Sequence, residues 1–319
     1  MSNAGPDFDS PHPRPSRKRR ASAVALAVVA AGALLGWGAY ATLGGPEDGG
    51  PGRGKSTAPS GRTAPSDGTS ANGGIGAGAH SGSGSGPGSA SGSAEASLKG
   101  KVVVIDPGHN PANHRHTAEI NRKVDIGTNR KECDTTGTST NSGYSEAAFT
   151  LDVAHRLRAL LQQRGATVKL TQDGDRPYGP CVDERARIGN AAHADAVVSI
   201  HADGSGSGNR GYHVILPGEV RSGGADTRAI VGPSRELGRL VSADFGRATG
   251  TAPSNYIGDG DGIVTRKDLG GLNLSTVPKV FIECGNMRDT KDAALLTSGA
   301  WRQKAAQGIS EGIVSFLRG

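Results

Sequence analysis

A sharp change in composition near residue 98 limits how much of this chain can fold. Between residues 44 and 97, glycine takes 17 of 54 positions, and there is no Phe, Trp or Tyr. Such a stretch cannot bury enough apolar surface to offset the entropy lost on ordering, so we expect a disordered Gly/Ser/Pro linker. The 222 residues of 98–319 are enough for one full hydrophobic core. The sequence therefore predicts a single folded domain after a long linker.

An uncharged segment of 23 residues, 21–43, precedes this linker and follows the basic run Arg-Lys-Arg-Arg at 17–20. As a helix it would rise about 34 Å, enough to cross a hydrocarbon core of about 30 Å. Basic residues stay on the cytoplasmic side, so we expect 1–20 to be a cytoplasmic tail and the domain to be exported. Two alternatives stay open: an uncleaved membrane anchor, or a signal segment cleaved near 39–41 that releases a secreted domain.

The net charge is mildly basic and dispersed. Of the formal +6, residues 98–319 contribute +4, from 28 Lys and Arg against 24 Asp and Glu. The chain has neither the basic stripe nor the recognition module of a nucleic-acid-binding protein. We therefore expect no nucleic-acid partner, and only a weak attraction to an acidic polymer or envelope.

Apolar runs and helical periodicity alternate along the predicted domain. Strands are expected at 101–105, 167–171, 196–200, 211–217 and 279–282, and helices at 146–164, 183–194, 234–249 and 301–317. Several of these strands are apolar on both faces, which is typical of parallel strands covered by helices. We therefore predict an α/β domain with a mostly parallel central sheet flanked by helices on both faces.

Three of these strands end beside side chains that can bind a metal or move a proton. His109 follows the first strand, His201 follows the third, and Glu283 ends the last. The carboxyl ends of parallel strands meet at one edge of a sheet, where sites form. With Glu146 at a helix start, the two histidines would make a set typical of catalytic zinc. On the residues alone, a surface or hydrogen-bonded role for each histidine stays open.

Four segments also occur in a characteristic order. They are Val-Ile-Asp-Pro-Gly-His at 104–109, Glu146 opening a helix, Val-Ser-Ile-His-Ala at 198–202, and Val-Phe-Ile-Glu-Cys-Gly-Asn at 280–286. Together they resemble the motifs of the zinc-dependent N-acetylmuramoyl-L-alanine amidases of the amidase-3 type. The resemblance spans about 101–318 and is strongest to actinobacterial members, through the shared segments 138–144 and 179–185.

The resemblance implies one zinc ion per domain, bound by His109, Glu146 and His201, with Glu283 as the catalytic carboxylate. It implies hydrolysis of the amide between N-acetylmuramic acid and the L-alanine of the stem peptide, in peptidoglycan or a soluble muropeptide. It also implies an extracytoplasmic place of action, at the membrane or in the cell wall. We expect the enzyme to be a monomer.

Two departures from the family pattern concern the substrate groove. This chain has Asn110-Pro111 after the first histidine, where Gly-Gly is common, and Cys284-Gly285 after the glutamate, where Gly-Phe is common.

Two alternatives to the amidase function stay open. One is another exported zinc hydrolase of wall polymers, a peptidase or deacetylase. The other is a tethered wall-binding module without catalysis, against which the presence of all four site residues argues.

The three cysteines allow one disulfide. Pairing is favoured in an exported domain. Cys133 and Cys181 lie in predicted loops, whereas Cys284 ends a core strand, so we predict a Cys133–Cys181 bond and a buried Cys284 thiol. No C-x-x-C spacing supports a cysteine metal site.

A polar, basic segment of 36 residues, 110–145, separates His109 from Glu146. Structureless loops of this length are uncommon in compact domains and are often lids or binding loops. We predict that it borders the substrate groove, the alternative being a surface excursion away from the site. Asp106 is expected not to bind the metal itself, but to be a turn residue or to accept a hydrogen bond from a ligand imidazole and fix its tautomer. Asn286 is expected to orient substrate or a loop, or to cap the chain locally.

Overall fold

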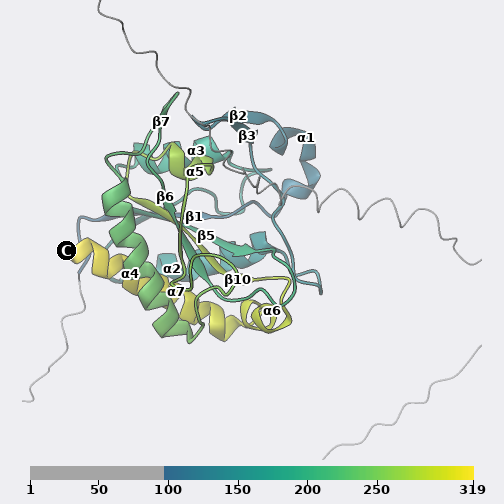
Figure 1. The fold of residues 1–319 in the computed structure, drawn as a ribbon. Coiled ribbons are helices and arrows are strands. Elements are labelled where there is room, and N and C mark those ends of the chain that lie inside the picture. Colours follow the sequence, from purple (N-terminus) through teal and green to yellow (C-terminus); the bar gives the residue numbers. More distant parts are fainter. Residues whose placement is uncertain (1–96) are drawn as a thin grey trace, which may run out of the picture. The chain divides into compact units, whose positions relative to one another are not determined.

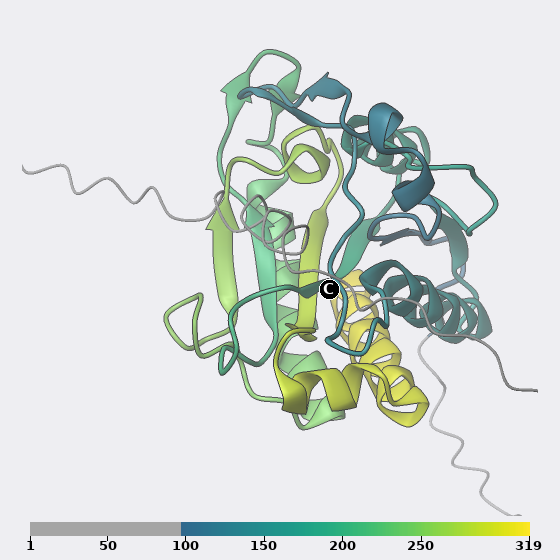
Figure 2. The ribbon, with the colours of Figure 1, turned by 90° about the vertical axis from the view of Figure 1, so that its right-hand side faces the viewer.

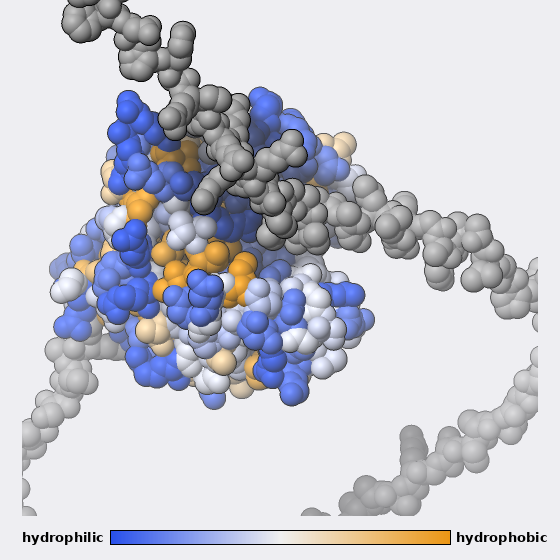
Figure 3. Space-filling view, viewed as in Figure 1, coloured by the Kyte–Doolittle hydropathy of each residue, from blue (hydrophilic) through white to orange (hydrophobic). Residues whose placement is uncertain are grey.

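The computed structural model describes residues 97–319 (Figure 1). The basic tail, the apolar segment 21–43 and the linker predicted over 44–97 lie outside the described residues, apart from Ser97. Among the described residues, no helix combines the length and the apolar character needed to cross a bilayer. In the view of Figure 1 most of the coloured surface is polar, with an apolar area near its centre (Figure 3).

A six-stranded sheet with the order β4-β1-β5-β10-β6-β9 forms the centre of the domain. Strands β4, β1, β5 and β10 are parallel, whereas β6 is antiparallel to β10, and β9 runs parallel to β6. Their bounds are β1 Val102–Pro107, β4 Thr167–Leu170, β5 Ala196–Asp203, β6 His213–Pro217, β9 Ile263–Arg266 and β10 Lys279–Asn286. The predicted mostly parallel sheet is confirmed. The edge strand β9 is not predicted from the sequence, because its apolar run is only two residues long, Ile263 and Val264.

Helices cover both faces of this sheet (Figures 1 and 2). One face packs against α2 (Glu146–Gln163), α4 (Val231–Thr249) and α7 (Gly299–Arg318), and α3 (Val182–Ala191) packs on the other. Side chains alternate along β1, so Val103 joins the first core and Val104 the second. This two-sided burial explains why the sequences of the central strands β1 and β5 are largely apolar on both faces. The short helices α5 (Gly270–Asn273) and α6 (Thr290–Leu296) complete the layers.

The segment 110–145 is folded rather than structureless. It contains a 3-10 helix (Asn113–Arg115), α1 (Thr117–Ile120), and a hairpin of β2 (Lys123–Asp125) and β3 (Arg130–Glu132). Outside this segment, a second hairpin pairs the two-residue strands β7 (Arg221–Ser222) and β8 (Ala225–Asp226). These elements are too short and too polar to show a periodicity in the sequence.

A small apolar cluster and a disulfide stabilise this folded segment. Val124 and Ile126 pack with Cys133 and Cys181 in a cluster separate from the main core. The predicted Cys133–Cys181 bond is present and joins residues 48 positions apart. Cys284 is a buried free thiol, as predicted. The segment is therefore tied to the start of α3 at the side of the sheet where the site lies.

Candidate active site

The three side chains predicted to bind metal lie together at the carboxyl ends of the parallel strands. One donor atom from each of His109, Glu146 and His201 lies within 4.8 Å of the other two. Oε1 of Glu146 is 3.2 Å from Nε2 of His109 and 2.9 Å from Nδ1 of His201. Two imidazole nitrogens and a carboxylate oxygen form the donor set of a catalytic zinc site, which keeps a further position open. The arrangement therefore fits such an ion.

Each of these side chains is fixed by a regular element. His109 follows the end of β1, and His201 lies within β5, where its ring stacks on Phe281 with the ring centroids 4.9 Å apart. Glu146 is the first residue of α2, and the Ser145 hydroxyl accepts a hydrogen bond from the amide of Ala148, as a helix N-cap does. The helix start therefore sets the position of the carboxylate.

Two glycines let the backbone approach these side chains. A Cβ atom at Gly108 would overlap the ring of His201. A Cβ atom at Gly137 would lie 2.7 Å from Cδ2 of His109 and 2.8 Å from Oε2 of Glu146. The same Oε2 accepts a hydrogen bond from the amide of Thr138 at 2.9 Å. The segment 137–138 therefore closes one side of the group without a side chain at its tightest point.

The two neighbouring carboxylates control the protonation of His109. Burial alone lowers the pKa of this imidazole, but Glu146 and Asp134 outweigh it and raise the pKa to about 10. Burial likewise opposes ionisation of Glu146, yet His109 and His201 hold the pKa of this carboxyl well below its usual range.

Glu283 lies beside this group without contributing a donor atom to it. It is the register partner of His201 on the neighbouring strand, and both line a cavity of about 320 Å³. The Oε2 atom of Glu283 is buried and has no hydrogen-bond partner. The nearby guanidinium of Arg288 forms no ion pair with Glu283 and donates instead to the carbonyl of Ser139.

The surroundings of Glu283 favour its protonated form. Burial is the largest cause, and the carboxylates of Glu146 and Asp203 act in the same direction, so the pKa of Glu283 is raised well above its usual value. A buried carboxyl group whose pKa is raised in this way suits a general acid or base.

Comparison with known proteins identifies the family. The family model described as N-acetylmuramoyl-L-alanine amidase matches residues 103–315. The chain belongs to this amidase family. The amidase Rv3717 of Mycobacterium tuberculosis is 43% identical over 224 residues, which cover 70% of this chain and 88% of that protein.

Two solved amidase structures are also similar. The crystal structure of Ami1 from Mycobacterium smegmatis has a TM-score of 0.64 at 40% identity, covering 70% of this chain and 99% of that chain. The apo form of Ami1 from Mycobacterium abscessus gives 0.64 and 40%, covering 69% and 100%. These likenesses support the predicted family and fold.

A second cavity, of about 250 Å³, adjoins the first in the amidase domain and shares residues with it, among them His109, His201 and Phe281. Residues of the segment 110–145 line both cavities: Lys131, Glu132, Asp134 and Thr135 in one, and Thr135, Gly137 and Thr138 in the other. The predicted position of this segment beside the site is therefore confirmed, and the alternative of a surface excursion is wrong.

Of the roles considered from sequence for Asp106, the contact with a ligand imidazole is not formed. It lies buried beneath the site and accepts hydrogen bonds from Nζ of Lys279 at 2.9 Å and Nη1 of Arg185 at 2.8 Å. Thr171 and Ser199 donate to it as well. The contact expected of Asp106 is made instead by Asp134, whose Oδ1 is 3.3 Å from Nδ1 of His109.

Asn286 holds a loop of the amidase domain. Its Nδ2 donates to the carbonyls of Ser205, Gly206 and Asn209, and its Oδ1 accepts from the amides of Ser205 and Arg288. Of the roles considered from sequence, loop orientation describes these contacts. The loop follows β5, so Asn286 fixes the chain just beyond His201.

His213 is a site neighbour that the sequence analysis left without a role. It is buried, is the register partner of Glu283 on β6, and has an Nδ1 atom without a hydrogen-bond partner. Burial lowers its pKa to about 4, so the ring is neutral at pH 7. A histidine inside an apolar run carries no spacing signal, and only the strand register places it beside Glu283.

Proposed function

We propose that the domain hydrolyses the amide bond between N-acetylmuramic acid and the L-alanine of the stem peptide, using one zinc ion held by His109, Glu146 and His201. One observation carries this proposal: a histidine–glutamate–histidine group and a buried, unpaired carboxyl group at Glu283 share one cavity. Membership of the amidase family supports the same bond as the target.

The residues divide the work of hydrolysis. Zinc in a three-ligand site supplies Lewis-acid activation of water and of the scissile carbonyl. Glu283 takes the proton of the attacking water and returns it to the leaving nitrogen of L-alanine. Phe281 and the backbone at Gly137 limit the space around the group, so the amide must enter from the open side of the cavity.

The substrate class sets the place of action. Peptidoglycan lies outside the cytoplasm, and the similar proteins are named N-acetylmuramoyl-L-alanine amidases. We therefore assign 1–20 as a cytoplasmic tail, 21–43 as a membrane anchor or signal segment, 44–97 as a linker and 98–319 as the catalytic domain. A flexible linker of 54 residues spans about 40 Å on average, which lets a monomeric domain reach wall material near the membrane.

A metal analysis tests the proposed site. The purified full-length protein should contain one zinc ion per chain, lose activity on a muramyl-peptide when chelated, and recover it when zinc is added. His201→Ala should lose both zinc and turnover. His155→Ala is the matched control. This exposed histidine lies further along α2, away from the metal group, and pairs with Asp173. Full zinc occupancy with normal turnover in His201→Ala would refute the ligand assignment.

A further inference from the structure

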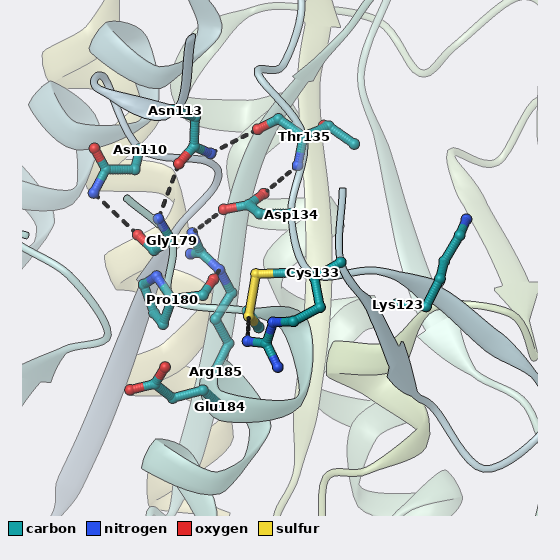
Figure 4. The surroundings of a disulfide bond; sticks show 12 residues. Asn110, Asn113, Lys123, Cys133, Asp134, Thr135, Gly179, Pro180, Glu184 and Arg185 are labelled. Carbon is teal, nitrogen blue, oxygen red and sulfur yellow. Dashed lines mark hydrogen bonds and ion pairs between the residues drawn. A yellow bond between two sulfur atoms is a disulfide. The ribbon is translucent and has the colours of Figure 1, made fainter. Parts of the chain in front are cut away.

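A single arginine, Arg185, donates hydrogen bonds to several backbone carbonyl groups near the metal group. Arg185, in the first turns of α3, is buried, and every nitrogen of its guanidinium group donates a hydrogen bond. Figure 4 shows its contact with Asp134. Nε donates to the carbonyl of Pro180 at 2.9 Å, and Nη1 to the carbonyl of Pro107 at 2.6 Å and to Asp106. Nη2 donates to the carbonyl of His109 and to Oδ2 of Asp134, both at 3.0 Å.

The backbone that Arg185 holds at His109 is strained. His109 has a φ of +60°, in the left-handed region that residues other than glycine seldom adopt. Such a conformation persists only where its surroundings over-determine it. Here Arg185 and Nε2 of Gln172 both donate to the carbonyl of His109, each at 3.0 Å. The arginine therefore helps to keep this residue in the conformation that directs its ring at Glu146.

Asp134 acts on the ring of the same histidine. Nδ1 of His109 lies 3.1 Å from the carbonyl of Thr135, 3.2 Å from the hydroxyl oxygen of the same residue and 3.3 Å from Oδ1 of Asp134. The carbonyl and the carboxylate can only accept hydrogen bonds, so they favour a proton on Nδ1. In the neutral ring that binds a metal, the other nitrogen, Nε2, then carries the lone pair, on the side of Glu146. The remaining oxygen of Asp134 is held by Arg185, so one carboxylate connects the arginine to the ring.

The Cys133–Cys181 disulfide joins the segment that carries Asp134 to the segment that carries Arg185. Cys133 precedes Asp134, and Cys181 is the residue before α3, four positions from Arg185. The amide of Val182 also donates to the carbonyl of Cys133 at 2.8 Å. The arginine and the carboxylate are therefore tied together covalently as well as by their ion pair.

We infer that Arg185 and Asp134 are positioning residues for metal binding: they fix the backbone and the ring tautomer of His109 so that Nε2 faces the metal. This inference rests on the proposed zinc site. Neither residue touches the ion or the substrate in this assignment; each acts through His109. Residues that orient a metal ligand in this way typically change metal affinity or activity 10- to 100-fold when replaced.

The test measures zinc affinity of the full-length protein by competition with a chromophoric chelator. Arg185→Lys keeps the charge but cannot reach Pro107, His109 and Asp134 together. Asp134→Asn keeps the size but can turn its amide NH₂ toward Nδ1, which favours the wrong tautomer. Each variant should bind zinc about 10- to 100-fold more weakly. The double variant should bind zinc only slightly more weakly than the weaker-binding single variant, because Arg185 and Asp134 both act on the ring of His109.

Glu184→Gln is the matched control on the same helix. It breaks the Arg176–Glu184 ion pair, with its Nη1–Oε1 distance of 2.9 Å, which does not involve His109. This variant should bind zinc as the unchanged protein does. The visible spectrum of the cobalt(II)-loaded proteins adds a readout of ligand geometry, which Arg185→Lys and Asp134→Asn should alter and Glu184→Gln should not. Asp134→Asn carries the test if Arg185→Lys does not fold.

Two results would overturn the inference in distinguishable ways. If the unchanged protein binds zinc and hydrolyses a muramyl-peptide, but both variants keep its zinc affinity and cobalt spectrum, the positioning role is wrong and the proposed function stands. If the unchanged protein binds no zinc, the proposed site and the positioning role both fail.

Discussion

Glu283 stands beside His201, because the two are register partners on the parallel strands β10 and β5. On its other side, Glu283 is paired with His213 of the antiparallel strand β6. Paired residues on neighbouring strands project to the same face of a sheet. A row across three strands therefore places one carboxyl group between the metal group and a buried, neutral imidazole. The backbone of the sheet, rather than a loop, fixes this order.

Replacing Glu283 separates metal binding from chemistry. Glu283→Gln keeps the shape of the side chain but cannot accept a proton. We expect unchanged zinc content and a loss of turnover by a factor of about 10² or more, the usual scale for a general base. Zinc analysis and steady-state rates on a muramyl-peptide measure both. Loss of zinc in this variant would mean that Glu283 is a ligand and that the roles of Glu283 and Glu146 must be exchanged.

Filling the space at Gly137 should weaken the metal site. In Gly137→Ala the new Cβ would press on His109 and Glu146, and the φ of +73° adds backbone strain. Gly143→Ala is the control, because its φ is +89° but nothing lies within 4 Å of the added Cβ. We expect weaker zinc binding only in Gly137→Ala. Equal zinc affinity in the two variants would show that the contact at Gly137 is unimportant.

The neutral state of His213 should make stability depend on pH. Its pKa is lowered from 6.5 to about 4 by burial. Between these values the unfolded chain binds a proton that the folded chain does not. This contribution to stability is therefore complete above pH 6.5 and is lost as the pH falls toward 4.

Protonation of His213 should lower the free energy of unfolding by about 3 kcal/mol, because each unit of pKa shift corresponds to roughly 1.4 kcal/mol. Urea unfolding of the unchanged protein and of His213→Asn, at pH 7 and at pH 4.5, measures it. The gap in unfolding free energy between the two proteins should narrow at the lower pH. A constant gap would contradict the buried, neutral histidine.

Opening the Cys133–Cys181 bond should affect stability and substrate access. A bond across 48 residues contributes about 4 kcal/mol of loop-closure stabilisation. The segment 110–145 that it holds lines both cavities. The variant with both cysteines replaced by serine should therefore unfold at lower urea concentration, and its rate on polymeric peptidoglycan should change more than its rate on a small muramyl-peptide. Equal changes on both substrates, with folding intact, would show that the segment does not control access.

The sequence predicts the parts of this protein that depend on local pattern. The runs that form β1, β5 and β10 are apolar on both faces, so their burial and their ends could be located, and with them His109, His201 and Glu283. Ser145 before an amphipathic run located the start of α2 and hence Glu146. In each case a property of neighbouring residues carries the information.

The remaining parts depend on contacts between distant segments. His213 reaches Glu283 only through strand register, and Asp134 reaches His109 only because the segment 110–145 folds back to the disulfide. Arg185 lies in a segment noted for its family resemblance, but its partners come from three separate stretches of chain, 106–109, 134 and 180. No single-sequence pattern encodes such pairings, so Asp106 was assigned the contact that Asp134 makes.

The products formed from a defined muramyl-peptide test the central claim most directly. The full-length protein is incubated with the substrate, with and without a chelator, and the products are resolved by mass. We expect free stem peptide beginning with L-alanine, intact N-acetylmuramic acid, no reaction with chelator, and recovery on adding zinc. Cleavage between two amino acids, or release of acetate, would contradict it and identify a peptidase or a deacetylase.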